Sequence, residues 1–518
     1  MATSLTFVKG AGGLSRPLAG SDYISGMLFY SGATLPTGFT SNDRIKVVYS
    51  LAEAVALGIT NGSLGETAST ATYLFTTKFT TGDTFKLTCA TIDSTNPIAA
   101  TAAAGTITLC DMTADATAAT STTTSATAVA AAINARTYIH GFTATSNTAT
   151  VTITAAPGQG LFLNTGTPYV VTIVGAAAGT LTQNVVVGVA SDIDIMYYHI
   201  SEFFRIQPKG KLYVGIYATA GVGTFTEITT MQNFAEGEMR QIGVYYKSTG
   251  FTAAHCTTLQ SIYTTNATNN RPLNIIVCGD LQGTADLTTL SNLRALSAQN
   301  VTAVIGQDGS GQGFKLWKAT AKSIGILGAT LGAVALSSVS ESIAWIGKFN
   351  IDNGAECNYL AFTNGVTWKA SSTGFISGLD AYGYVFLKKE MDISGSFFND
   401  SSTCVSSSSD YAYIESGRTI DKATRSMRFY VVPAIAAPVY FNEDGTITEG
   451  SVAYFEALAQ RGLDDMVSAG ELSAAKASID PTQNVLSTGT LTIVVQLIPV
   501  GVARTIVINV GYTLAITN

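Results

Sequence analysis

The chain has 518 residues, a length sufficient for about three or four domains with hydrophobic cores of their own. Hydrophobic residues make up 46% of it and charged residues only 12%, which is about half the usual charged share. This composition excludes a disordered chain and indicates surfaces that become buried against other copies of the same protein. The net charge of −7, with no basic cluster longer than Lys209-Gly-Lys211 or Lys388-Lys389, argues against a nucleic-acid partner.

Cysteines and apolar runs indicate neither a disulfide framework nor a membrane span. The six cysteines lie far apart without a CxxC pair, which predicts buried free thiols, although Cys89 and Cys110 could be neighbours on adjacent strands. No secretory signal is visible at the N-terminus. The longest apolar stretch, Ile324–Leu336, is shorter than the ~20 residues that a bilayer span needs. We therefore expect assembly in a cytoplasm, with no direct membrane insertion.

Residues 66–191 differ in composition from everything around them, being dominated by Thr and Ala. Alternation in Phe85-Lys-Leu-Thr-Cys and Thr150-Val-Thr-Ile-Thr predicts strands with one buried face, and Ala126–Arg136 is predicted to be helical. Low complexity could also mean disorder. The repeated β-branched alternation favours a β-rich inserted domain instead.

The segments on either side of this insertion, 31–65 and 192–370, form one predicted α/β core domain. Nearly all-apolar strands alternate with helices there, a pattern typical of a mostly parallel sheet covered on both faces. The predicted strands are Lys211–Tyr217, Ile242–Tyr246, Leu273–Cys278 and Val301–Ile305, and the predicted helices are Phe225–Gly237, Ala253–Tyr263 and Leu287–Ser297.

The last part of the chain, 371–504, is predicted to be an α+β domain followed by a terminal strand. A helix over Ser451–Ala469 carries apolar residues at spacings of three to four, and Leu491–Leu497 reads as a strand. Thr505–Thr517 alternates strictly and needs partners for its backbone and its apolar face. The pattern leaves open whether it is an edge strand of its own domain or a strand lent to a neighbouring subunit. Its apolar row is Ile506, Ile508, Val510, Tyr512, Leu514 and Ile516.

From about Tyr411 onward the sequence resembles the C-terminal domain of contractile tail sheath proteins. The residues that carry this resemblance are Arg418-Thr-Ile-Asp-Lys-Ala-Thr-Arg425, Pro433–Pro438, the helix after Asn442-Glu-Asp-Gly445, and Val485–Pro499. Upstream, three further runs are similar to a sheath subfamily common in Bacteroidetes phages and injection systems. They are Tyr198-His-Ile-Ser-Glu-Phe-Phe, Val339-Ser-Glu-Ser-Ile and Gly383-Tyr-Val-Phe-Leu.

The resemblance implies a subunit of a helical homopolymer around an inner tail tube protein, with baseplate and tail terminator proteins as further partners. It implies a place in the virion tail, or in a released or cytoplasmic injection particle. It also implies exchanged terminal strands, from an N-terminal arm within 1–30 (about Ser4–Lys9) and a C-terminal arm, 505–518. The 371–504 domain would face the tube, which it would contact through Glu456, Arg461, Asp464 and Asp465, unless these form only a solvated acidic face.

No catalytic, cofactor or metal site is predicted. His140, His199 and His255 have no ligand partners at metal-binding spacing, and local hydrogen bonding explains them better. The glycines at 306, 309, 311 and 313 follow a predicted strand but do not match a phosphate-binding spacing. Two alternatives to a sheath remain: another self-assembling baseplate or shell protein, and a hydrolase whose β-rich insertion binds sugar.

Overall fold

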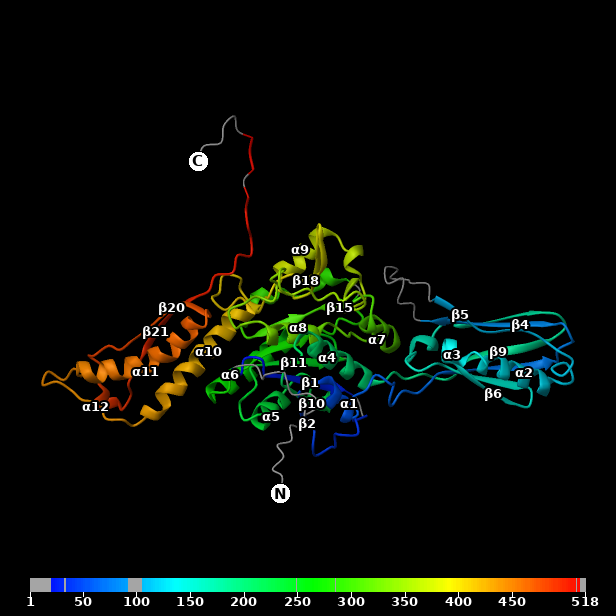
Figure 1. The fold of residues 1–518 in the computed structure, drawn as a ribbon, viewed down its shortest axis with the longest axis horizontal. Helices are drawn as coiled ribbons and strands as arrows, with labels where there is room; N and C mark the ends of the chain where they lie inside the picture. Colours follow the sequence, from blue (N-terminus) through cyan, green and yellow to red (C-terminus); the bar gives the residue numbers. More distant parts are fainter. Residues whose placement is uncertain are drawn as a thin grey trace, which may run out of the picture. The chain divides into compact units, whose positions relative to one another are not determined.

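A computed structural model describes residues 20–31, 34–91, 105–247, 249–284, 286–508 and 510–512 (Figure 1). The chain divides into two compact units: Met1–Leu336 with Ile343–Ile414, and Ser337–Ser342 with Glu415–Asn518. The domain boundary predicted at residue 371 differs from this division, because residues 371–414 belong to the first unit. Leu379, Tyr384 and Phe386 pack in its core, and Val385 forms a parallel bridge with Val304.

The first unit is built on a six-stranded sheet in the order β14-β12-β11-β1-β10-β2. Its neighbours pair in parallel except at the β10–β2 edge, which is antiparallel. The prediction of a mostly parallel α/β core is therefore confirmed in this unit. The strands are β1 (Ser25–Ser31), β2 (Ile45–Val48), β10 (Leu212–Ala218), β11 (Gln241–Tyr246), β12 (Asn274–Cys278) and β14 (Val301–Val304).

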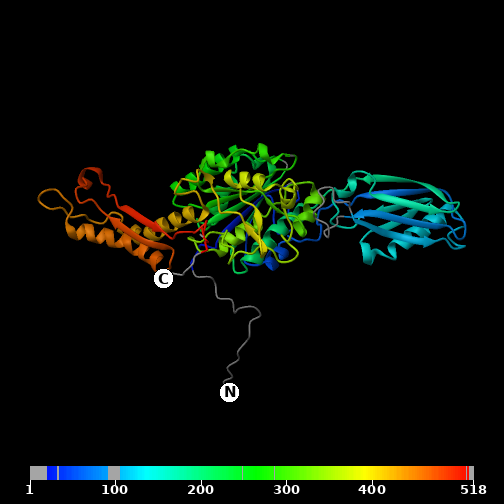
Figure 2. The same cartoon turned by 90° about the horizontal axis from the view of Figure 1, so that it is seen from above.

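Helices cover both faces of this sheet, as near-continuous apolar strands require (Figures 1 and 2). Alternate residues of each strand enter two separate cores: Met27 and Phe29 pack into one, Leu28 and Tyr30 into the other. The first core includes α4 (Asp192–Ile206) and α8 (Leu327–Leu336), and the second includes α5 (Glu227–Phe234) and α6 (Ala253–Thr268).

Two sequence predictions for this unit are wrong. Residues 25–30, assigned to an N-terminal arm, form β1 at the centre of the sheet because all of them are buried and paired on both sides. The predicted helix Leu287–Ser297 is two 3-10 turns, Leu287–Thr289 and Leu293–Ala295. The side chains of Asp286 and Asn292 accept hydrogen bonds from backbone N–H groups two residues on, which competes with a continuous helix.

The remaining elements of the core are short. They are α1 (Leu51–Ala56), α7 (Gln312–Thr320), α9 (Thr373–Ala381), the 3-10 turns Thr219–Gly221 and Trp368–Ala370, and three small antiparallel pairs. The pairs are β13 (Ser297–Ala298) with β19 (Cys404–Val405), β15 (Gly306–Asp308) with β16 (Leu360–Phe362), and β17 (Leu387–Glu390) with β18 (Ile393–Phe398). All six cysteines are buried and free, as predicted.

The inserted segment has a hydrophobic core that is drawn from its own residues alone. Two sheets form it, in the orders β6-β7-β3-β9 and β5-β4-β8, and Val129 and Ile133 of α2 belong to the same core. The elements are β3 (Thr70–Thr77), β4 (Thr84–Thr91), β5 (Gly105–Thr113), α2 (Thr122–Asn134), α3 (Thr137–His140), β6 (Thr143–Asn147), β7 (Thr150–Thr154), β8 (Tyr169–Val174) and β9 (Ala178–Val186).

The second unit is α+β. Helices α10 (Ile414–Val431) and α11 (Glu449–Ser468) pack with an antiparallel pair, β20 (Leu472–Ser478) and β21 (Val494–Pro499), and a short helix, α12 (Val485–Thr488), lies between those strands in the sequence. Apolar residues of α11 such as Leu463 and Met466 enter this core, as the predicted helical spacing requires.

The apolar stretch noted in the sequence, Ile324–Leu336, contains α8, whose residues 327–335 are all buried against other parts of the first unit. Gly328 makes this packing close, since a Cβ atom there would lie 2.1 Å from the carbonyl oxygen of His199 on α4. None of the helices among the described residues has the length and apolar character that crossing a bilayer requires.

Candidate assembly surfaces

The glycine-rich loop between β15 and α7 wraps around a carboxylate of its own. Asp308 is fully buried, and its side chain accepts hydrogen bonds from the N–H groups of Ser310 (3.0 Å), Gly311 (2.9 Å) and Gly313 (3.1 Å). These donors lie at the start of α7, where a helix would otherwise attract an external anion. The position where an anion could bind at the start of α7 is therefore already occupied by the side chain of Asp308.

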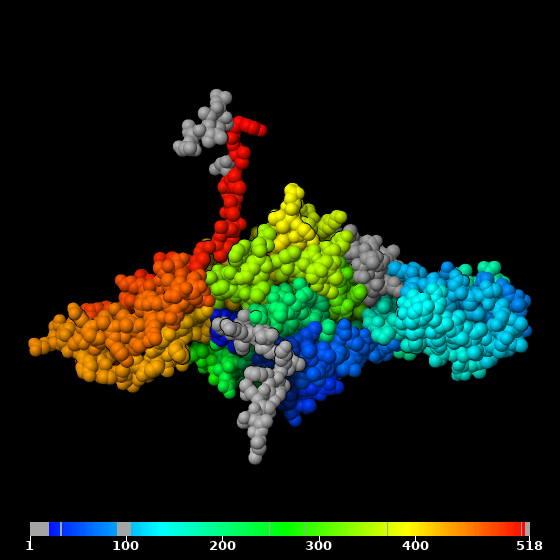
Figure 3. Space-filling model, viewed as in Figure 1, coloured from blue at the N-terminus to red at the C-terminus, as the bar shows by residue number. Residues whose placement is uncertain are grey.

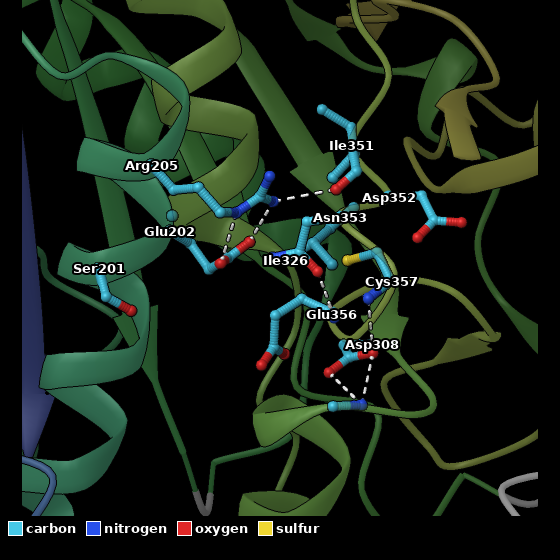
Figure 4. A network of polar contacts seen from close by, with 12 residues as sticks. Ser201, Glu202, Arg205, Asp308, Ile326, Ile351, Asp352, Asn353, Glu356 and Cys357 are labelled. Atoms are coloured by element: carbon cyan, nitrogen blue, oxygen red, sulfur yellow. Dashed lines mark hydrogen bonds and ion pairs between the residues drawn. The ribbon is translucent and has the colours of Figure 1, made fainter. Parts of the chain in front are cut away.

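A second carboxylate completes this cluster (Figure 4). Glu356 accepts a hydrogen bond from Gln312 N–H (2.8 Å), and the N–H of Cys357 donates to Asp308 (2.8 Å). Burial, together with the hydrogen bond and charge of Asp308, raises the pKa of Glu356 to about 8. The raised pKa favours the protonated form of Glu356 beside Asp308. The cluster fastens the loop around residue 356 to α7 and leaves its donors no role in binding a phosphate.

Each histidine has a hydrogen-bond partner within the chain, although that of His199 lies far away in the sequence. His140 lies 3.1 Å from the carbonyl oxygen of Leu109, and Tyr246 Oη lies 3.0 Å from Nδ1 of His255. His199 is buried beneath α8, where its Nδ1 accepts from the Gly328 N–H, and burial lowers its pKa to about 3. Within the described part of the chain, no group of three or more His, Cys, Asp or Glu side chains could hold a metal ion.

The segment after β21 exposes its apolar side chains. Ile506 and Ile508 are each 77% exposed, Val510 is 92% exposed, and Tyr512 is completely exposed. Residues 505–508 and 510–512 belong to no strand, and in Figures 1 and 3 the red segment runs clear of β20 and β21. The predicted strand residues Leu514 and Ile516, like the predicted N-terminal arm Ser4–Lys9, lie outside the described residues. The described residues of the segment are thus not an edge strand of their own domain.

An ion pair fixes the point at which this segment begins. The guanidinium of Arg504 binds the carboxylate of Glu415, a buried residue in the first turn of α10. The residues between β21 and Arg504 are therefore tied to the helical part of the second unit. No local pattern indicates this pair, because 89 positions separate its members.

The four residues predicted to touch a tube all lie on α11, but they have intramolecular partners too. Glu456 is half-buried and accepts a hydrogen bond from Ile479 N–H (2.8 Å), whereas the other three are exposed. Asp464 accepts from the side-chain amide of Gln460 (2.8 Å). Asp465 accepts from the hydroxyl of Tyr430 (2.7 Å), whose ring lies 4.9 Å from the guanidinium of Arg461. The hydrogen bond to Asp465 raises the pKa of Tyr430.

Sequence reasoning missed Gln460 and Tyr430, which organise these acidic side chains. Gln460 and Asp464 are four positions apart on a helix, and this spacing was the one sequence signal that could have predicted their hydrogen bond. Tyr430 comes from α10, so its position beside Arg461 and Asp465 follows from the packing of two helices.

Comparison with known proteins gives one family and several distant structures. Residues 410–517 match the family described as DUF2586, C-terminal domain. No curated protein matches the chain. The chain is similar to the contracted helical sheath of the anti-feeding prophage, at 14% identity and a TM-score of 0.44, over 61% of this chain and 81% of that one. It is also similar to the contracted PVC sheath of an extracellular contractile injection system, at 13% identity and a TM-score of 0.40, over 62% of this chain and 80% of that one. A sheath tail protein from Listeria innocua is similar at 10% identity and a TM-score of 0.37, over 93% of this chain and 96% of that one.

Proposed function

We propose that this protein is a structural subunit of a contractile tail sheath, of the subfamily common in Bacteroidetes phages and injection systems. It polymerises helically around an inner tube protein and contracts to drive that tube through a target envelope. The observation that carries the proposal is the C-terminal segment, whose apolar side chains are exposed and unpaired within the described chain. An exposed apolar row of this kind is stabilised when another surface buries it. In the class of protein that the sequence resembles, neighbouring subunits bury such terminal segments.

In this proposal the segment 505–518 adds a strand to a neighbouring copy, and an N-terminal arm before β1 does the same. Each exchanged strand would contribute ladder hydrogen bonds of about 1 kcal/mol net apiece, besides covering its apolar face. The low charged share of the chain, 12%, supports a protein that buries much of its surface in a polymer.

The second unit would face the inner tube, and the exposed Arg461, Asp464 and Asp465 on α11 are its proposed contacts. Exposed ion pairs are worth only about 0.2–1 kcal/mol each, so many of them can hold a sheath extended and still break together. The energy of contraction would then be stored at assembly in a kinetically trapped state, without ATP. Baseplate and tail terminator proteins would bound the polymer at its ends, in a virion tail assembled in the host cytoplasm.

The inserted domain, 66–191, would lie on the outer surface of the particle. Its core is its own, so it can be carried as an appendage without supporting the α/β sheet. The outer radius of a cylinder leaves room for such a domain between neighbouring subunits.

Electron microscopy of the purified protein tests the proposal. Long striated tubes would support a sheath, discrete rings would favour a baseplate component, and monomers would favour the hydrolase alternative. The matched variant ends at Arg504, so it keeps the ion pair with Glu415 and loses only the segment beyond it. We expect this truncated protein to be folded and soluble but unable to form tubes, and normal tubes from it would contradict strand exchange.

A further inference from the structure

The first unit contains a cavity of about 400 Å³ beside the turn that follows β16. Three short segments line it: residues 358–360 at the start of β16, residues 367–369 at the 3-10 turn after that strand, and Lys389 of β17. Small-molecule sites in proteins have volumes of about 300–1,000 Å³, so the cavity has the size of such a site. None of the assembly surfaces described above includes these residues.

Hydrogen bonds fix the backbone around the cavity. Phe362 N–H donates to the carbonyl oxygen of Val366 (2.8 Å), which closes the turn between the first two lining segments. Tyr359 is tied to the loop before α7, because its carbonyl oxygen accepts from Gly309 N–H (2.9 Å) and its N–H donates to Ser310 Oγ (3.2 Å). The cavity is therefore formed without a ligand, as most small-molecule sites are.

Two hydrogen-bond donors in the cavity wall lack acceptors. The hydroxyl of Thr367 and the Nε1–H of Trp368 are buried, and neither has a partner among the described residues. Thr367 is only 7% exposed, so bulk water does not replace the missing partner. Buried donors without acceptors are unfavourable and rare in folded proteins. A ligand that brings a hydrogen-bond acceptor into the cavity would remove this cost.

The cavity is positively charged. Lys369 is exposed, and its ammonium group forms no ion pair with the described part of the chain. Lys389 pairs with Asp352 (3.2 Å), so two lysines and one carboxylate leave one positive charge. No acidic residue is among the described residues that line the cavity. This balance fits a ligand with a single negative charge.

We propose that this cavity binds a small organic monoanion, a carboxylate carried on an aromatic or branched aliphatic body. The carboxylate would accept from the donors of Thr367 and Trp368 beside the ammonium group of Lys369, and the body would pack on Tyr359 and Leu360. A phosphate dianion fits less well, because its second charge would have no counter-ion in a largely apolar wall. The inference goes beyond the sheath function and does not depend on polymerisation.

Calorimetric titration of the full chain with phenylacetate tests the proposal. Phenylacetamide has the same ring without the charge, and acetate has the charge without the ring. We expect phenylacetate to bind, and phenylacetamide to bind at least about ten-fold more weakly, because it cannot form a charge-assisted hydrogen bond. Acetate should give no measurable binding at the same concentrations, since it leaves the apolar wall uncovered.

Four variants assign the binding to this cavity. Lys369→Gln removes the unpaired charge and should weaken phenylacetate binding about ten-fold. Thr367→Val and Trp368→Phe keep the shape of the wall and remove one donor each, so each should weaken binding about three- to ten-fold. Neither should lower the melting temperature, because the donors have no partner to lose. Lys209→Gln changes an exposed lysine outside the cavity and should bind as the parent does.

Three outcomes would overturn the proposal. Equal affinities for phenylacetate and phenylacetamide would show an apolar cavity without an anion site. Absence of phenylacetate binding at millimolar concentration, or parental affinity in both Lys369→Gln and Trp368→Phe, would show that this cavity is not the site. Binding to single subunits but not to assembled tubes would show that a neighbouring copy covers the cavity in the particle.

Discussion

Gly462 of α11 faces the backbone of α10 so closely that a Cβ atom there would lie 2.6 Å from the carbonyl oxygen of Ser426. The atoms that such a Cβ would meet include Met427 N at 2.8 Å, and backbone atoms cannot rotate away as the end of a side chain can. The two helices that carry Tyr430, Arg461 and Asp465 are therefore positioned by the absence of one side chain.

Gly462→Ala should destabilise the second unit by about 1–3 kcal/mol, the usual cost of overpacking, despite the better helix propensity of alanine. The measurement is chemical denaturation of the full chain followed by a probe of the second unit. Gly450→Ala, in the first turn of the same helix, is the matched control, since nothing lies within 4 Å of its Cβ position. The control should be neutral or slightly stabilising, and equal effects of the two substitutions would contradict close contact at Gly462.

The carboxyl pair at α7 predicts a dependence of stability on pH. Glu356 has a pKa of about 8 in the folded chain against an ordinary value of 4.5, so the folded state binds this proton more tightly. Its contribution to stability is complete below pH 4.5 and is lost as the pH rises toward 8. Glu356→Gln, which keeps a neutral hydrogen-bonding group, should remove this part of the dependence. Thermal melts between pH 5 and 9 test it, and parallel curves for the two proteins would contradict a raised pKa at Glu356.

The sequence predicted the parts of the fold that depend on local patterns. The four core strands and α11 follow from apolar runs and helical spacing, because such segments have one way to bury their side chains. Contacts between distant residues escaped prediction. The glycine spacing after β14 was visible, but not that Asp308 turns back to fill the loop, and nothing local joins Glu415 to Arg504 or Tyr430 to Asp465. The hydrogen bonds between the Gln460 side chain and the backbone of Ala475 and Ala477 also depend on the packing of α11 against β20.

The Arg504–Glu415 ion pair predicts a charge-swap rescue. Arg504→Glu alone, or Glu415→Arg alone, places two like charges together at a partly buried site, which is strongly unfavourable. Each single variant should start the C-terminal segment in the wrong place and reduce tube formation. The double variant restores opposite charges and should recover tubes in electron micrographs. Melting curves provide the control for folding, and a double variant no better than the singles would contradict a positioning role.

The inserted domain should be removable, because its two connections lie side by side. Ser191 donates a hydrogen bond to the carbonyl of Leu64 (2.7 Å), and Thr67 forms an antiparallel bridge with Val189. Replacing residues 66–190 with a short Gly/Ser bridge keeps Ser191, which caps α4. We expect the shortened chain to fold and form tubes of smaller outer diameter. Failure to assemble despite a normal melting curve would contradict a place for the domain on the outer surface.

Asp465 offers the cleanest test of the proposed tube contact. Changing Asp464 and Asp465 together to Lys should give sheath that polymerises already contracted or fails to load on the tube. Asp464, however, also accepts a hydrogen bond from the side-chain amide of Gln460, which in turn bonds to the backbone of β20. This double change therefore also disturbs the contact between α11 and β20. Asp465 accepts a hydrogen bond from Tyr430 of α10, and this bond is exposed. Asp465→Lys alone therefore reverses one charge at the surface. It should weaken tube loading, because each subunit loses one exposed ion pair with the tube.

Two further variants show whether the charge of Asp465 or its hydrogen bond to Tyr430 is responsible for the effect. Asp465→Asn keeps an acceptor for the Tyr430 hydroxyl and removes the negative charge, so it should load tubes less well than the parent but better than the lysine variant. Asp410→Lys makes the same charge change at an exposed residue of the first unit and should load normally. The measurement is the fraction of extended, tube-filled particles in micrographs at low and moderate salt. Extended particles at the parental frequency from Asp465→Lys would place the tube contact elsewhere on the second unit.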